Sequence, residues 1–296
     1  MAKIKVAACQ YPIEPVGSVA AWAQKLERMV AEAARGGAQL VVLPEYGGME
    51  LASALPRPVQ ADLRLQLEHL QDLVPVYHET CAKLARRYCV YLLAASMPER
   101  VGDEFHNRAW MYGPSGEGNY VEKLQLTRWE RETWGVARGD ENVVFDTELG
   151  VVGVAICYDA EFPLLVRRLV EHGARIILVP SCTDALSGYW RVRIACQARA
   201  LENQCYVVQA TTVGSAPWSI AVDENRGAAG VYGPPDRGFP DSGVVAMGVL
   251  DQPGWVTAEI DLALVEAVRL DGEVPNHRDW VRSRHLQAAV ARHTIR

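Results

Sequence analysis

The stretch of sequence that decides the fold reads Gly150-Val-Val-Gly-Val-Ala-Ile-Cys157-Tyr-Asp-Ala-Glu-Phe-Pro163. Its apolar residues 151–156 predict a buried β-strand that ends at Cys157, and Pro163 suits the first turn of a helix that Asp159 can cap. A side chain at such a strand-to-helix turn lies at the carboxyl end of the sheet, where open α/β sheets place their active sites. The thiol of Cys157 is therefore a candidate nucleophile, provided that a neighbouring group removes its proton.

Strand-like and helix-like segments alternate along the whole chain. Short apolar runs predict strands, and apolar residues at helical spacing predict helices between them. The predicted strands cover residues 3–9, 40–43, 90–95, 109–112, 120–123, 151–156, 175–180 and 205–211, and the predicted helices cover residues 22–33, 72–87, 164–172, 189–203 and 262–268. This alternation predicts an α/β fold whose sheet is covered by helices. Because no linker, composition shift or repeat interrupts it, residues 1–296 are expected to form a single domain.

The composition excludes several classes of function. The chain has 296 residues, of which 49% are hydrophobic, and a formal net charge of −6 without any run of basic residues, so nucleic acid and anionic membranes are poor partners. No signal-peptide pattern and no bilayer-spanning apolar stretch occurs. The odd number of cysteines, seven, without a CxxC pair predicts free thiols in a reducing compartment, here the cytoplasm. The histidines show no ligand-like pairing and no phosphate-binding loop occurs, so neither a metal nor another cofactor is expected.

Two charged residues at the ends of other predicted strands can serve a cysteine nucleophile. Glu45 directly follows one buried strand, and Lys123 ends another strand-like segment. As a general base, Glu45 would take the thiol proton of Cys157 and later deliver it to a leaving amine. Lys123 would stabilise the thiolate and the tetrahedral oxyanion, with the backbone N–H of Tyr158 as a second oxyanion donor. Together these groups predict acyl transfer through a thioester.

Each of these residues also has an ordinary structural interpretation. A single cysteine after a strand is usually a small buried side chain, and a single glutamate or lysine is usually a solvated surface charge. The presence of all three residue types at strand ends favours the catalytic interpretation over three separate coincidences.

Three short motifs in this order resemble the signatures of the nitrilase superfamily of carbon–nitrogen hydrolases. They are Leu43-Pro-Glu45, Glu122-Lys123-Leu and Ile156-Cys157-Tyr-Asp159-x-x-Phe162-Pro163, and the similarity extends to Arg199-Ala-Leu-Glu202-Asn203-Gln204. The resemblance, which covers residues 3–280, implies a four-layer αββα sandwich that forms dimers through the helical layer beside the active site. It also implies that Glu45 is the general base, Lys123 the oxyanion stabiliser and Cys157 the nucleophile.

A second glutamate often follows the lysine in this family, and the chain offers two candidates. Glu130 matches the spacing of the nitrilase branch best, with Trp134 and Gly135 behind it, and Glu132 is the alternative. The second glutamate would position the substrate and keep Lys123 charged. The structural alternative is a solvated cluster of arginines and glutamates.

The residues after the nucleophile narrow the class of substrate. Carbamoylases of amino acids resemble one another in carrying arginines just after the Cys-x-Asp motif, whereas this chain has Ala160-Glu161, so a bidentate carboxylate clamp is missing there. Glu161 would favour a cationic or amine-bearing substrate if it lines the pocket, and a carboxylate in the first turn of a helix is the alternative. Further residues that are expected to line the pocket are Tyr46, Thr183, Asp184 and Trp190.

These observations predict a thiol amidohydrolase that cleaves a linear, non-peptide C–N bond, with a small primary amide as the preferred substrate and ammonia as a product. A nitrilase, an N-carbamoyl-amine amidohydrolase and a catalytically silent binding relative are alternatives on the same site. A Cys–His hydrolase that pairs Cys157 with His106 or His172 is a rival, but it leaves Glu45 and Lys123 without a role. The expected partners are a small amide, nitrile or ureido substrate and a second copy of the chain, with the basic tail, residues 279–296, contacting that copy.

Overall fold

The computed structural model describes residues 3–285 and 291–294. The α-helices are α1 (Val19–Arg35), α2 (Arg57–Gln60), α3 (Leu63–Leu70), α4 (Val74–Tyr88), α5 (Pro163–Glu171), α6 (Leu186–Asn203), α7 (Leu262–Asp271) and α8 (Asn276–His285). The short helices of other types are η1 (Gly47–Ala54), η2 (Gln71–Leu73), η3 (Glu130–Trp134) and η4 (Cys157–Glu161). The strands are β1 (Ile4–Pro12), β2 (Leu40–Val42), β3 (Tyr91–Leu93), β4 (Met97–Val101), β5 (Glu104–Tyr112), β6 (Gly118–Glu122), β7 (Val136–Ala137), β8 (Val144–Thr147), β9 (Gly150–Val154), β10 (Ile176–Ser181), β11 (Tyr206–Ser215), β12 (Glu224–Asn225), β13 (Gly230–Tyr232), β14 (Val244–Met247) and β15 (Gly254–Ile260).

Two sheets share hydrogen bonds where β1 runs parallel to β11, with Gln10 opposite Thr211. Away from this junction, β1 pairs with β2 on one side and with β15 on the other, whereas β11 pairs with β10 and β13. The first sheet therefore runs in the order β4-β5-β3-β2-β1-β15, and β6 and β7 also pair with β5. The second sheet runs in the order β14-β13-β11-β10-β9-β8. The chain thus forms two sheets that separate from a common edge.

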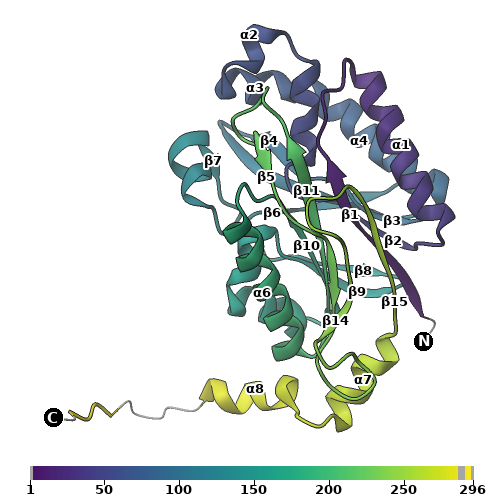
Figure 1. Cartoon of the computed structure of the whole chain (residues 1–296), viewed down its shortest axis with the longest axis vertical. Helices are drawn as coiled ribbons and strands as arrows, with labels where there is room; N and C mark the ends of the chain where they lie inside the picture. Colours follow the sequence, from purple (N-terminus) through teal and green to yellow (C-terminus); the bar gives the residue numbers. More distant parts are fainter. Residues whose placement is uncertain (1–2, 286–290, 295–296) are drawn as a thin grey trace.

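Alternate residues of β1 enter two different hydrophobic cores, because successive side chains of a strand point to opposite faces. Val6 and Ala8 pack in the core that contains the second sheet, whereas Ala7 and Cys9 pack in the core that contains α1 and α4. Helices α5 and α6 add their apolar side chains to the outer face of the second sheet. The order of layers is helix, sheet, sheet, helix (Figure 1), which confirms the four-layer αββα sandwich that the family resemblance implies.

The segments that the sequence pattern left out are amphipathic or lie at a sheet edge. Strand β4 carries Pro98 and two charged residues, and proline is tolerated at the edge of a sheet because its missing N–H then faces no partner. Strand β15 alternates buried and exposed residues and also lies at an edge. Helix α3 is short and carries charges along one side. Apolar runs alone therefore recover the central elements and miss these.

Helix α8 extends away from the body of the molecule (Figure 1). It is attached through Arg167 of α5, whose guanidinium donates to the carbonyl of His277 at 3.1 Å and lies 5.2 Å from the ring of Trp280. Residues 286–290 and 295–296 of the predicted partner-binding tail lie outside the described residues. Within the described part, no helix is long and apolar enough to cross a membrane.

Candidate active site

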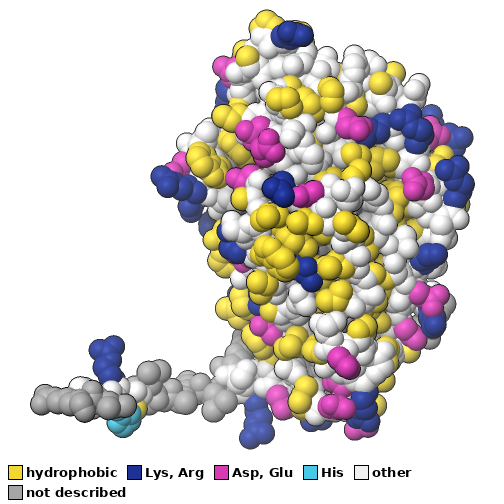
Figure 2. All heavy atoms as spheres, in the orientation of Figure 1, with side chains coloured by type: hydrophobic (Ala, Val, Ile, Leu, Met, Phe, Trp, Pro, Cys, Tyr) yellow, Lys and Arg dark blue, Asp and Glu magenta, His cyan; other side chains and the backbone are white. Residues whose placement is uncertain are grey.

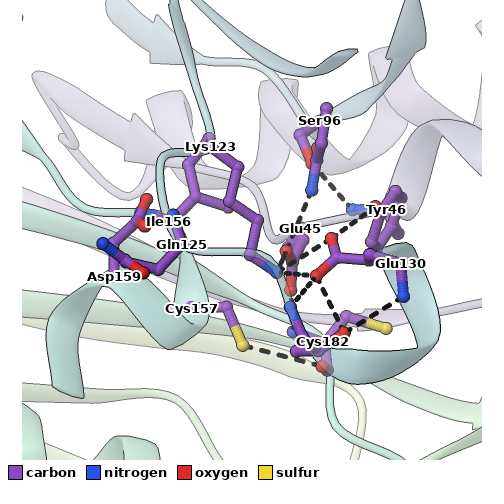
Figure 3. A network of polar contacts seen from close by, with 12 residues as sticks. Glu45, Tyr46, Ser96, Lys123, Gln125, Glu130, Ile156, Cys157, Asp159 and Cys182 are labelled. Carbon is purple, nitrogen blue, oxygen red and sulfur yellow. Dashed lines mark hydrogen bonds and ion pairs between the residues drawn. The ribbon is translucent and has the colours of Figure 1, made fainter. Parts of the chain in front are cut away.

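The sandwich brings Glu45, Lys123 and Cys157 together from the ends of β2, β6 and β9. The ammonium nitrogen of Lys123 lies 2.7 Å from the Glu45 carboxylate. The Cys157 sulfur lies 3.7 Å from the carbonyl oxygen of Cys182, a contact drawn in Figure 3, and the thiol also interacts with the Glu45 carboxylate. These three side chains are almost closed off from solvent, with exposed fractions of 1% for Glu45, 1% for Lys123 and 4% for Cys157. These groups are therefore shielded from bulk water.

Cys157 sits in a strained turn. Strand β9 ends at Val154, and Cys157 opens η4 with a φ of 49°, in the left-handed region that non-glycine residues rarely adopt. Such strain is retained where the surrounding structure fixes the backbone, typically at functional sites. Pro163 is the first residue of α5, as predicted, but the helix is capped by Phe162 without a side-chain hydrogen bond, so the prediction that Asp159 caps it is wrong.

Asp159 ties the nucleophile turn to the segment that follows the lysine. Its carboxylate accepts backbone N–H groups of Gln125 at 2.6 Å, Leu124 at 3.2 Å and Ile156 at 3.1 Å (Figure 3). Burial raises the pKa of Asp159 to about 7, against the opposing effects of Lys123 and these N–H groups. A single buried carboxylate thus holds the segments that carry Lys123 and Cys157 against each other.

The loop that carries Glu45 is hydrogen-bonded by two residues from other parts of the fold, Ser96 just before β4 and Thr212 in β11. Tyr46 has a φ of 55°, and its backbone N–H donates to Ser96 Oγ at 3.0 Å. Thr212 Oγ1 donates to the carbonyl oxygen of Glu45 at 2.8 Å. A Cβ atom at Gly48 would lie 2.7 Å from the side chain of Met97, so only glycine lets the loop approach this closely. The backbone of the candidate base is therefore rigidly placed.

Both oxygens of the Glu45 carboxylate have partners. Oε1 accepts from Lys123 Nζ at 2.7 Å and from Asn107 Nδ2 at 3.0 Å, and Oε2 accepts from the backbone N–H of Cys182 at 3.1 Å. Burial raises the pKa of Glu45, and the positive charge of Lys123 opposes this. Sequence reasoning missed Asn107 and the backbone N–H of Cys182, because neither role leaves a signal in a local motif.

Of the two candidate second glutamates, the structure brings Glu130 to the lysine. Lys123 Nζ lies 2.9 and 2.8 Å from its two oxygens, Tyr46 donates its hydroxyl at 2.6 Å, and Thr127 donates both its N–H and its hydroxyl. Burial alone would raise the pKa of Glu130, but Lys123 and these hydrogen bonds outweigh it and lower that pKa. Glu132 lies at the surface and pairs with Arg128 at 2.7 Å.

The surroundings of this cluster favour a protonated thiol beside a positively charged lysine. Burial would lower the pKa of Lys123, but Glu130 and Glu45 outweigh it and raise that pKa, so the ammonium persists. Burial raises the pKa of the Cys157 thiol, Glu45 raises it further, and Lys123 opposes the rise. The thiol therefore needs a base at the moment of attack, and Glu45 is the carboxylate beside it.

The other predicted pocket residues lie around the nucleophile turn and the loop after β10. Thr183 follows Cys182 and donates its hydroxyl to the carbonyl of Arg226 at 2.8 Å. Glu161 ends η4 and lies 3.5 Å from Arg191 of α6. Two of the predicted residues, Asp184 and Trp190, are exposed at the surface. The ring of Tyr158, whose N–H is the predicted second oxyanion donor, packs edge-on against Phe162.

The two histidines of the rival Cys–His hypothesis are engaged elsewhere. His106 Nδ1 lies 3.1 Å from the carboxylate of Glu122, on the face of β5 opposite to Asn107. His172 Nδ1 lies 2.8 Å from the carbonyl of Arg168 at the end of α5.

In the part of the chain that the structure describes, no three Cys, His, Asp or Glu side chains are grouped as metal ligands would be.

Comparison with known proteins shows the family of this chain. A family model described as carbon-nitrogen hydrolase matches residues 5–270. The chain belongs to the carbon–nitrogen hydrolase family, within the nitrilase superfamily.

This carbon–nitrogen hydrolase is 32% identical over 278 residues to the probable hydrolase YhcX of Bacillus subtilis (strain 168), covering 93% of the chain but 53% of that relative. The chain thus spans about half of that protein. It is 29% identical to the deaminated glutathione amidase of Synechocystis sp. (strain PCC 6803 / GT-S), covering 87% of the chain and 92% of that enzyme. Its fold matches the crystal structure of Nit3 of Saccharomyces cerevisiae, a member of branch 10 of the nitrilase superfamily, with a TM-score of 0.70 at 22% identity over 90% of this chain and 93% of that one.

The ion pair between Lys123 and Glu130 can be tested through stability. Replacing Glu130 by Gln keeps its size but leaves the buried ammonium with one carboxylate, and breaking a buried pair costs about 3 kcal/mol. Glu132→Gln is the matched control, because an exposed pair contributes about 0.5 kcal/mol or less. Urea denaturation at pH 7 should show this difference. Equal stabilities of the two variants would contradict the assigned role of Glu130.

The raised pKa of Asp159 predicts a pH dependence of stability. With a pKa of about 7 in the folded protein and an ordinary value of 3.8, the folded state binds this proton more tightly between these values. Stability therefore falls as the pH rises through that window, by at most about 1.4 kcal/mol per pH unit. Asp159→Asn exchanges no proton here, so the free energy of unfolding of the wild type should decline relative to the variant from about pH 4 to pH 7 and then level off. Urea denaturation across this range checks it, and a constant difference would refute it.

Proposed function

We propose that this protein is a thiol amidohydrolase that cleaves small linear amides through a thioester on Cys157. The observation that carries the proposal is the placement of Lys123 against the Glu45 carboxylate beside a buried cysteine. These groups supply a base, a nucleophile and a fixed positive charge in a site that is nearly closed to water, where electrostatic stabilisation is strongest.

The proposed reaction begins when Glu45 accepts the thiol proton as Cys157 Sγ attacks the carbonyl carbon of the amide. The oxyanion that forms is stabilised by the ammonium of Lys123 and by the backbone N–H of Tyr158. Glu45 then gives its proton to the amide nitrogen, the C–N bond breaks and ammonia leaves a thioester. Water, deprotonated by Glu45, attacks the thioester carbon, and the sulfur departs and recovers its proton from Glu45. The products are ammonia and a carboxylic acid.

An amide is favoured over the other substrates of the site. The Synechocystis relative is an amidase that aligns with 87% of this chain. The carboxylate of Glu130 accepts hydrogen bonds from Lys123, Tyr46 and Thr127. These bonds suit a residue that positions Lys123 and keeps it protonated. Nitriles and N-carbamoyl amines are alternatives on the same groups, because thioester chemistry serves all three. The residues that we propose to contact substrate are Tyr46, Glu161, Thr183, Asp184 and Trp190.

We also propose that two copies associate through the outer face of α5 and α6. Apolar side chains gather over α6 in Figure 2, and the exposed ones on these helices are Leu164, Leu186, Trp190, Ile194 and Leu201. Such patches commonly mark interaction sites. The seven cysteines are free thiols, which fits a homodimer in a reducing compartment such as the cytoplasm.

Ammonia release from a panel of primary amides, nitriles and N-carbamoyl amines tests the reaction. Release from an amide should fall by about 10³-fold or more in Cys157→Ala, because the covalent intermediate can no longer form. Cys89→Ala is the matched control, since this thiol is exposed and outside the site. Release from nitriles or N-carbamoyl amines alone would select one of those alternatives, and release that survives in Cys157→Ala would refute the mechanism.

The proposed dimer can be tested by placing a charge on its apolar face. Ile194 is 62% exposed on α6, and Ile194→Glu should shift the mass measured by light scattering after gel filtration from dimer to monomer. Leu270→Glu is the control, because Leu270 is 81% exposed but lies on α7. A wild-type protein that is monomeric at micromolar concentration would refute this interface.

A further inference from the structure

Asn107 donates a side-chain amide hydrogen bond to the carboxylate of the candidate base. It lies in β5, is fully buried, and donates from Nδ2 to Glu45 Oε1 at 3.0 Å. Its backbone carbonyl accepts the N–H of Lys123 at 3.0 Å. One residue therefore contacts the candidate base through its side chain and the oxyanion-stabilising residue through its backbone.

We propose that Asn107 is a positioning residue that fixes the Glu45 carboxylate and lowers its affinity for a proton. This inference rests on the proposed role of Glu45 as the general base. A hydrogen bond donated to a carboxylate stabilises its charged form, and more so in a buried site than in water. Asn107 thereby favours the ionised form of Glu45, which is the form that can accept the thiol proton of Cys157.

The alternative, that Asn107 merely supports the fold, is opposed by its other amide atom. Oδ1 of Asn107 is buried and has no hydrogen-bond partner among the described residues. A buried acceptor without a partner costs stability, so an apolar residue of similar size would serve the fold equally well. Its side chain makes one hydrogen bond, and that bond goes to Glu45.

The neighbours of Asn107 in the strand point away from the site. His106 and Arg108 lie on the other face of β5 and pair with the carboxylate of Glu122. Strand alternation therefore sends one polar side chain of this segment inward and two outward. The inward one occupies the position beside Glu45.

The proton affinity of Glu45 depends on every group that faces it. From the other elements these are the ammonium of Lys123 after β6, the carboxylate of Glu130 in η3, the thiol of Cys157 in η4 and the backbone N–H of Cys182 after β10. Lys123 is shared with Glu130, so its charge is only partly available to Glu45. Because Lys123 is shared, the hydrogen bond from Asn107 makes a larger relative contribution to the proton affinity of Glu45.

Two substitutions of Asn107 separate positioning from packing. Asn107→Leu removes the donor at similar volume, and Asn107→Asp puts a second carboxylate about 3 Å from Glu45, where two like charges cannot both ionise. The acid limb of the pH dependence of kcat/KM should move upward by about one pH unit in the Leu variant and by more in the Asp variant. We expect kcat to fall while KM changes little, because the donor acts on the base and does not touch the substrate.

A second measurement does not need a substrate. The rate of alkylation of Cys157 by iodoacetamide, resolved from the other thiols by peptide mass spectrometry, should show the same graded upward shift in pH. Asn142→Leu is the matched control, because its partly buried amide makes one hydrogen bond, to the carbonyl of Leu165, outside the site. Thermal unfolding of all variants separates changes of chemistry from loss of fold.

The pH profiles and the unfolding data together decide whether Asn107 positions Glu45. A shift in the order wild type, Leu variant, Asp variant, with the control unchanged, supports the proposal. Coincident pH profiles, or a loss of activity that follows a loss of stability, would overturn it. If no compound of the panel is turned over even by the wild type, the proposed function fails, while the alkylation profile still decides the role of Asn107.

Discussion

The buried ammonium of Lys123 is the constraint on which the rest of the site depends. A charge that is 1% exposed persists in a protein only if opposite charges surround it, and Glu45 and Glu130 do so at 2.7 and 2.8 Å. This pairing links the end of β2, the end of β6 and η3 in one cluster. Closing the cluster to water strengthens its field at the point where an oxyanion would form. The ion pairs that allow Lys123 to be buried therefore also place its positive charge where the proposed reaction needs it.

The fold holds two backbone turns beside this cluster in conformations that are unfavourable for non-glycine residues. Tyr46 and Cys157 both adopt left-handed conformations, at φ values of 55° and 49°, directly at the candidate base and nucleophile. Ser96 holds the first turn, and Asp159 holds the second against the segment after Lys123. Because strands of two mixed sheets pack directly behind these turns, the surrounding structure keeps the backbone in this strained conformation. The sandwich thus acts as a rigid frame for three short segments.

The sequence could predict that Glu45, Lys123 and Cys157 lie near one another because each is a reactive residue type at the end of a strand-like segment. The same logic failed for Asp159, which resembles a local helix cap but accepts N–H groups from Leu124 and Gln125, more than 30 residues earlier in the chain. Long-range hydrogen bonds leave no periodicity to detect. The alternation of strands and helices was predictable because central strands and amphipathic helices carry strong patterns, whereas edge strands such as β4 do not. The four layers followed only from the family resemblance.

The motif that begins at Arg199 connects helix α6 to the turn that carries Cys157. Arg199, buried in α6, donates to the carbonyl of Ala160 at 3.1 Å, and Ala160 belongs to the turn that opens with Cys157. Its own carbonyl accepts from Asn203 one turn later, which fixes the helix at this point. The opposite side of α6 carries Ile194 in the exposed apolar face. A partner that covers this face would therefore immobilise the helix that holds the nucleophile turn, so that association and placement of the thiol reinforce each other.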